Sequence, residues 1–191
     1  MNMTSIEDRL RRLEDKAAID DLNLRYFLAS DGDDLVTIGN SFTDDATFAS
    51  SGHVSGTGRQ GIIEFIAGAR SHMGLTIHTP HYGLYSFVGE DRATGLVGAH
   101  LELVLGGQAI LGAVRYVDEY RREGDRWRIS SRDMRTIYIG DWASTAEVFA
   151  SPTPVQWPGL DPLPSDYTRQ PLIAPYCAVI PASTTCSAPL M

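Results

Sequence analysis

Residues 93–121, ATGLVGAHLELVLGGQAILGAVRYVDEYR, contain the signal that decides the fold. Two apolar segments rich in Val, Leu, Ile and Tyr flank the pair Gly106-Gly107, and a two-residue glycine connection of this kind predicts a β-hairpin. Segments of similar composition precede and follow this hairpin, with turn residues between them. We therefore predict an antiparallel meander of four long strands, at residues 76–88, 93–105, 108–121 and 126–138.

The half of the chain before this meander has the apolar spacing of helices. The segments with this pattern are residues 6–31, a short stretch capped by Asp33-Asp34 and running to Phe42, and residues 61–72. Residues 43–45 are predicted as a turn before an extended piece, and residues 53–58 as a loose hairpin tip. Helices followed by strands, without β-α-β alternation, indicate an α+β fold.

The composition changes after Trp142. Nine of the ten prolines lie between Pro152 and Pro189, which disfavours regular structure there. The same region is too apolar for a free linker. We predict a domain at residues 1–142 and an extended C-terminal arm at residues 143–191, packed on the domain or on a neighbouring subunit. An apolar arm of this length favours a homo-oligomer.

Charge and composition exclude several classes of partner. A formal net charge of −8 argues against nucleic acid and anionic membrane, since both require clustered Lys and Arg. We see no secretory signal and no run approaching the ~18–20 apolar residues of a membrane span. Cys177 and Cys186 lack the Cys-x-x-Cys spacing and support neither a disulfide scaffold nor a zinc site. A cytoplasmic, reducing location is the expectation.

Acid–base chemistry is what the polar residues favour. The glycine-rich nucleotide motifs and the Gly-x-Ser-x-Gly motif of hydrolases are absent. The segment Ile77-His-Thr-Pro-His-Tyr82 begins a strand because Pro80 forces Thr79 to be extended. His78 and His81 should then point to opposite faces unless a bulge intervenes, so His-x-x-His predicts a metal site poorly.

Asp31 raises a separate question. It lies in the last turn of the predicted first helix, directly before Gly32, where the helix dipole disfavours a carboxylate by roughly 0.3–1 kcal/mol. One interpretation is a turn cap, which Asp often provides before Gly. The other is that Asp31 faces a pocket and has a partner there.

Four features together resemble the SnoaL-like branch of the NTF2-like superfamily. They are Arg25-Tyr26 followed by Asp31, the segment Phe42 to Phe48, His78 at the opening of the first long strand, and Tyr116 to Ile129. The resemblance covers residues 6–142. It implies a cone of curved antiparallel sheet, closed by N-terminal helices around one deep pocket, in agreement with the α+β order.

Within the superfamily the features look most like the cofactor-free lyases, such as scytalone dehydratase, bile-acid 7α-dehydratase and hexachlorocyclohexane dehydrochlorinase. The resemblance implies that Asp31 orients His78 as general base and that Tyr26 bonds a substrate oxygen. For substrate binding it implies His81, His100, Tyr116 and Arg135. Two choices stay open: His100 or Glu102 on the second long strand, and Arg132 or Arg135 on the last. No metal and no cofactor are implied.

The function implied is a cofactor-independent lyase acting on a hydrophobic, oxygenated aromatic or steroid-like compound, as in aromatic-compound catabolism. The reaction is a dehydratase-type elimination or a retro-aldol cleavage such as loss of formaldehyde, because the same base serves both. The alternatives are an isomerase or polyketide cyclase of the same fold, and a non-catalytic binding or assembly module. The lyases of this family also favour a homotrimer here, with a dimer as the alternative.

Overall fold

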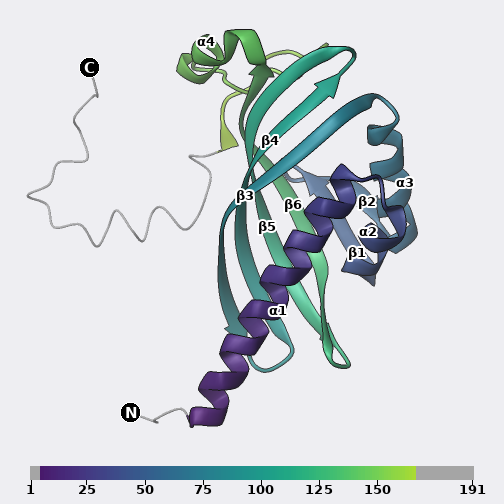
Figure 1. Cartoon of the computed structure of the whole chain (residues 1–191), viewed down its shortest axis with the longest axis vertical. Coiled ribbons are helices and arrows are strands. Elements are labelled where there is room, and N and C mark those ends of the chain that lie inside the picture. Colours follow the sequence, from purple (N-terminus) through teal and green to yellow (C-terminus); the bar gives the residue numbers. More distant parts are fainter. Residues whose placement is uncertain (1–4, 167–191) are drawn as a thin grey trace, which may run out of the picture.

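The computed structural model describes residues 5–166, in which helices precede one curved sheet (Figure 1). The elements are α1 (Ile6–Asp31), α2 (Leu35–Ser41), β1 (Phe42–Ser50), β2 (His53–Thr57), α3 (Gly58–Arg70), β3 (Met73–Val88), β4 (Arg92–Leu105), β5 (Gln108–Glu123), β6 (Arg126–Asp141), the 3-10 turn η1 (Trp142–Ser144) and α4 (Thr145–Ala150). This confirms the predicted α+β class.

Helix α1 has a well-defined beginning and end. The Ser5 hydroxyl accepts from the Asp8 N–H at 3.0 Å and the Asp8 carboxylate accepts from the Ser5 N–H at 3.2 Å, which forms a capping box. The Gly32 N–H closes the last turn on the Leu28 carbonyl. The helix buries Ile19 and the residues around Phe27 against the sheet, whereas Leu10 and Leu13, whose spacing also suggested a buried face, are exposed.

The sheet has six strands in the order β2-β1-β6-β5-β4-β3. The predicted meander is present as β3 to β6, with each neighbouring pair antiparallel. The β4–β5 turn is Gly106-Gly107, whose φ values of 57° and 82° explain the need for glycine. The pair β1–β6 is parallel, so the sheet is mixed rather than wholly antiparallel.

Two local predictions before the meander were wrong. Residues 43–45 belong to β1 instead of a turn, because Phe42 is buried in the core and already aligns with Ile129 of β6. Residues 53–57 form the strand β2, which pairs with β1. The actual turn between these strands is Ser51-Gly52, where both residues have positive φ.

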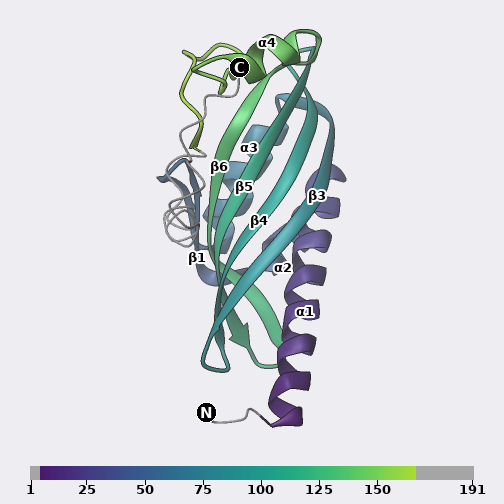
Figure 2. The same cartoon turned by 90° about the vertical axis from the view of Figure 1, so that its left-hand side faces the viewer.

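Helix α1 packs along the sheet on the side of β3, while α2 and α3 lie near β1 and β2 (Figures 1 and 2). The core fills the space between these helices and the inner face of the sheet. Its largest fully buried apolar side chains include Phe42, Ile19, Ile38, Ile62 and Ile129. None of the helices within residues 5–166 combines the length and apolar composition needed to cross a bilayer.

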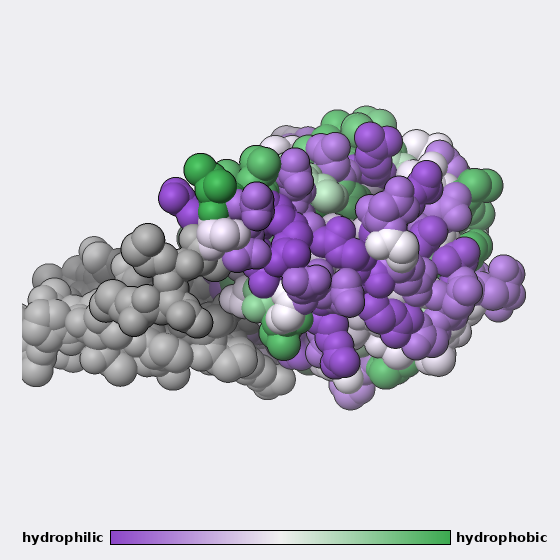
Figure 3. All heavy atoms as spheres, turned by 90° about the horizontal axis from the view of Figure 1, so that it is seen from below, coloured by the Kyte–Doolittle hydropathy of each residue, from purple (hydrophilic) through white to green (hydrophobic). Residues whose placement is uncertain are grey.

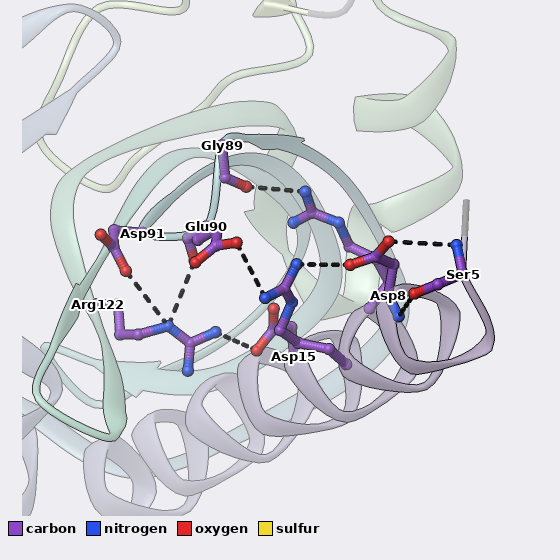
Figure 4. Close-up of polar contacts among 9 residues, drawn as sticks. Ser5, Asp8, Asp15, Gly89, Glu90, Asp91 and Arg122 are labelled. Atoms are coloured by element: carbon purple, nitrogen blue, oxygen red, sulfur yellow. Dashed lines mark hydrogen bonds and ion pairs between the residues drawn. The ribbon is translucent and has the colours of Figure 1, made fainter. Parts of the chain in front are cut away.

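An ionic cluster fastens the N-terminal half of α1 to the turn between β3 and β4 (Figure 4). Arg122 of β5 pairs with Asp15 of α1 and, at 3.7 Å, with Asp91. Arg11 pairs with Glu90 at 2.9 Å, and Arg12 donates to the Gly89 carbonyl at 2.8 Å. The corresponding end of the molecule has a mainly hydrophilic surface (Figure 3).

The described part of the predicted C-terminal arm packs on its own domain. Val148 of α4 lies against Gly140, and Val155 bridges to Ile139 and Leu163. The expectation of a wholly extended arm was wrong for residues 145–150, which are helical because the prolines begin only at Pro152. The rest of the arm, residues 167–191 with both cysteines, lies outside the described residues.

Candidate functional site

A cavity of about 130 Å³ lies between α1, α3 and the inner face of the sheet. Its wall is mainly apolar and includes Phe48, Phe65 and Leu101, with Trp157 contributed by the segment after α4. The polar residues that line it are Tyr26, Ser30, Arg70, Thr76, His78 and Tyr116. A predominantly apolar cavity with few polar groups is typical of a small-molecule site.

Asp31 and His78 meet at this cavity. One Asp31 carboxylate oxygen lies 2.6 Å from His78 Nδ1, and the other accepts from the His78 backbone N–H at 2.9 Å. Phe27 stacks on the imidazole with ring centroids 5.2 Å apart and an interplanar angle of 12°. The Asp31 side chain is only 21% exposed and the His78 side chain only 10%. Asp31 therefore has a partner at the helix end rather than a turn-capping role alone.

This geometry determines which histidine nitrogen can react. A carboxylate at Nδ1 accepts the N–H there, which leaves Nε2 as the basic nitrogen. Within residues 5–166 the His78 ring makes no hydrogen bond other than that to Asp31. An ionised Asp31 also stabilises the imidazolium formed when Nε2 takes a proton. The pair can therefore act as a general base at the cavity wall.

Two phenols, Tyr26 and Tyr116, line the same cavity and share a cation behind them. The Arg132 guanidinium lies over both rings, 4.4 Å from the Tyr26 centroid and 4.6 Å from that of Tyr116. Burial raises the pKa of Tyr26, and it raises the pKa of Tyr116 further. Both phenols consequently remain protonated at neutral pH and can donate hydrogen bonds.

Arg132 is held by a buried ion pair. Its Nε and Nη2 lie 2.9 and 2.7 Å from the two carboxylate oxygens of Asp118, and Nη2 also donates to Asn23 Oδ1 at 2.5 Å. Burial alone would lower the pKa of Arg132, but Asp118 outweighs it and holds the pKa above the ordinary value. The Tyr120 hydroxyl completes the network with a 2.6 Å bond to Asp118.

The structure places the two candidate arginines differently, and neither of them lines the cavity. Arg132 is fully buried behind the two phenols, whereas Arg135 pairs with Asp133 and does not line the cavity. Residues three positions apart on a strand point to opposite faces, so only one of the two can face inward. Arg135, predicted as a substrate-binding residue, therefore lies away from the site.

His81 and His100 are also placed away from the cavity. Their rings meet edge to face with centroids 4.2 Å apart, and neither lines the cavity beside His78. A bulge between Pro80 and Tyr82 shifts the β3–β4 register at His81, and His100 points to the face opposite Leu101. Glu102 lies on the same face of β4 as His100. Neither of these two alternatives for the second long strand therefore lines the cavity. Burial and then the neighbouring His81 lower the pKa of His100.

Two polar features of the site were missed by the sequence analysis. Arg70, at the end of α3, reaches the cavity, donates to the Thr76 hydroxyl and pairs with Asp33 at 2.5 Å. Asp33 lies 37 positions before Arg70, and no sequence motif links Arg70 to either partner. Asn23 of α1 joins the Arg132 network through partners that are distant in the sequence. The sequence did contain one signal for this network, since Asp118 and Tyr120 are two positions apart and therefore lie on one face of their strand.

Across the part of the chain that the structure describes, no three His, Cys, Asp or Glu side chains are grouped so that they could hold a metal ion.

The fold and the site define the class: an NTF2-like α+β protein with a His–Asp pair in an apolar cavity. A family model described as a SnoaL-like domain matches residues 11–133. The chain belongs to the SnoaL-like family.

The proteins that the chain is similar to include several dehydrochlorinases. It is 31% identical over 136 residues to a gamma-hexachlorocyclohexane dehydrochlorinase of Sphingobium indicum strain UT26S, covering 68% of this chain and 85% of the relative. The crystal structure of LinA matches with a TM-score of 0.66 and 29% identity over 71% of this chain and 94% of that one. The LinA-type3 dehydrochlorinase of Novosphingobium barchaimii LL02 matches at 0.65 and 27%, with the same coverage.

Proposed function

We propose that this protein is a cofactor-independent lyase that eliminates a proton and a leaving group from a hydrophobic ring compound. The observation that carries the proposal is the 2.6 Å contact between Asp31 and His78 Nδ1 at the wall of an apolar cavity. It supports a general base whose free nitrogen, Nε2, serves a bound substrate. The likeness to dehydrochlorinases supports elimination over the retro-aldol alternative.

In the proposed reaction, His78 Nε2 removes a proton from a ring carbon. The C–H electron pair becomes the new double bond as the leaving group departs from the adjacent carbon with its own electron pair. Asp31 stabilises the resulting imidazolium, and a general base of this kind contributes typically 10²–10⁴-fold. Tyr26 bonds the departing group. A halide leaves without a proton, whereas a hydroxide leaves as water after taking one from the imidazolium.

The size of the cavity limits the substrate. About 130 Å³ is close to the ~150 Å³ of an apolar protein cavity that holds one benzene molecule. We therefore propose a substrate with a single six-membered ring that is not aromatic, because elimination across two adjacent ring carbons requires both of these carbons to be saturated. The steroid-like compounds expected from the resemblance are larger than this volume and would have to extend out of the cavity.

The same geometry weighs against the two other functions considered. A non-catalytic module predicts a filled pocket or polar groups that are all paired internally, whereas here the cavity is open and His78 Nε2 has no partner within residues 5–166. An isomerase would use the same base. It is distinguished by mass, because isomerisation conserves the mass of the substrate and elimination lowers it.

The test is a screen of halogenated and hydroxylated cyclohexanes and cyclohexenes, followed by substitution of the site residues. We expect His78→Ala and Asp31→Asn each to lower turnover by roughly 10²–10⁴-fold. His81→Ala is the matched control, since His81 lies on the same strand outside the cavity, and it should keep the wild-type rate. Circular dichroism checks that each variant folds. Wild-type turnover in His78→Ala would contradict the assignment.

A further inference from the structure

The Tyr116 hydroxyl has no hydrogen-bond partner within residues 5–166, although the residue is almost fully buried. Tyr116 lies on β5 and is 2% exposed, with its ring held between Phe27, at a centroid distance of 5.6 Å, and the Arg132 guanidinium. It lines the cavity, yet within residues 5–166 its hydroxyl makes no hydrogen bond. Buried hydroxyls normally have partners, because leaving one unpaired costs stability.

The other polar groups of the cavity are already engaged. Ser30 donates to the Tyr26 carbonyl at 2.8 Å, and Arg70 donates to the Thr76 hydroxyl while pairing with Asp33. Tyr26 itself interacts with Ser30 and Arg132, which partly oppose the effect of burial on its pKa. With Tyr26 assigned to the departing group, the groups that remain for the rest of a ligand are His78 Nε2 as an acceptor and the Tyr116 hydroxyl as a donor, since neither has another hydrogen bond within residues 5–166.

Charge limits the kind of ligand. Both arginines near the cavity are matched by carboxylates, Arg132 by Asp118 and Arg70 by Asp33. An anionic ligand would therefore find no unpaired cation. Burial, followed by the charges of Tyr26 and Asp31 among others, raises the pKa of Tyr116, so its hydroxyl stays protonated and donates throughout the neutral range. These conditions fit a neutral ligand oxygen.

We propose that Tyr116 determines specificity in this cavity by donating a hydrogen bond to the oxygen of a neutral, single-ring substrate. This inference rests on the proposed function, which places a ring carbon of the substrate next to His78. It adds that the ring must carry a hydrogen-bond acceptor within reach of Tyr116. A ring that lacks this oxygen would leave the hydroxyl unpaired and would bind less well.

The test compares two probes of the same shape, cyclohexanone and methylenecyclohexane, of which only the ketone has an acceptor. Their dissociation constants are measured by NMR titration for the wild type, Tyr116→Phe and Tyr26→Phe. We expect Tyr116→Phe to weaken cyclohexanone binding about tenfold and to leave methylenecyclohexane nearly unchanged. Amide spectra verify that the fold is intact. Tyr26→Phe should retain most of the preference for the ketone.

Three results would overturn the inference: no binding of cyclohexanone to the wild type, equal ketone affinity in Tyr116→Phe, or loss of the preference in Tyr26→Phe alone. A second readout separates this from the proposed function. In deuterated water, His78 should exchange the protons next to the cyclohexanone carbonyl, and His78→Ala should not. If exchange is absent but the ketone preference depends on Tyr116, the result counts against the proposed lyase function and supports Tyr116 as the hydrogen-bond donor. If exchange occurs but the preference does not depend on Tyr116, the result supports His78 as the base and counts against Tyr116 as the donor.

Discussion

Arg132 and Arg135 stand three positions apart on β6 and have opposite surroundings. The first is fully buried beneath Tyr26 and Tyr116, and the second is partly exposed and pairs with Asp133. The sequence shows that only one of them can face inward, but a bulge between Glu119 and Tyr120 of β5 shifts the pairing with β6. A bulge of this kind reverses which positions face the core, which is why strand alternation in the sequence could not choose between Arg132 and Arg135.

This difference predicts unequal stability effects. Arg132→Met leaves the Asp118 carboxylate buried and unpaired, so the free energy of unfolding should fall by about 3–5 kcal/mol. Arg135→Met breaks a more accessible pair and should cost at most about 1 kcal/mol. Denaturant titration of both variants measures the difference. Equal losses would contradict the burial assigned to Arg132.

At the scale of elements, local sequence signals predicted the structure correctly, whereas the pairing of segments distant in the sequence could not be predicted. Gly106-Gly107 specified the β4–β5 hairpin because a two-residue turn is encoded by its own residues. The parallel pairing of β1 with β6 joins segments more than 80 positions apart, and no local pattern announces it. Helix α4 was missed for a different reason, since the proline-rich composition after Pro152 was extended backwards over residues 145–150.

Gly56 shows how closely β2 packs against α3. A Cβ at this position would lie 2.9 Å from Ile62 Cα and 3.0 Å from the Gly61 carbonyl oxygen, both backbone atoms of α3. We expect Gly56→Ala to lower the free energy of unfolding by about 1–3 kcal/mol, because β2 and α3 must move apart.

Gly61→Ala is the matched control. Its Cβ would meet nothing within 4 Å, and Ala is favoured over Gly inside a helix, so it should stabilise the protein by up to about 1 kcal/mol. Thermal unfolding of the two variants measures both effects. A harmless Gly56→Ala would contradict the close packing of β2 on α3.

At the scale of the whole molecule, β3 is an edge strand with an apolar outer side. Leu75, Ile77, Leu84 and Val88 are exposed along it, and the strand has the free edge of the six-stranded sheet. A long, exposed, apolar edge tends to pair with another chain. We therefore propose that the protein forms a homo-oligomer, with the trimer favoured and a dimer as the alternative. The cytoplasmic location stays a prediction.

Size-exclusion chromatography with light scattering tests the assembly. We expect a mass that is a multiple of the 20.9 kDa chain. Leu84→Lys, on the exposed side of β3, should shift the mass toward one chain, whereas Leu10→Lys on the exposed face of α1 should not. A single species of 20.9 kDa in the wild type would contradict the proposal.

The site was predicted in part, and the reason again lies in the topology. The structure brings Asp31 and His78 together across 47 positions, and it places Tyr26 and Tyr116, which the family resemblance also implied, at the same cavity. A family pattern carries such long-range information because it reflects a shared fold. His81 and His100 were misplaced because their facing depends on a bulge that residue spacing does not reveal.

The tautomer of His78 tests the central claim most directly, since it requires no knowledge of the substrate. Nitrogen-15 NMR at mildly alkaline pH, where an imidazole is neutral, distinguishes a protonated ring nitrogen from a basic one. The Asp31 contact predicts the proton on Nδ1 and the lone pair on Nε2, and Asp31→Asn should disturb this state. A proton on Nε2 of the wild-type protein would leave the cavity without its base and would contradict the account.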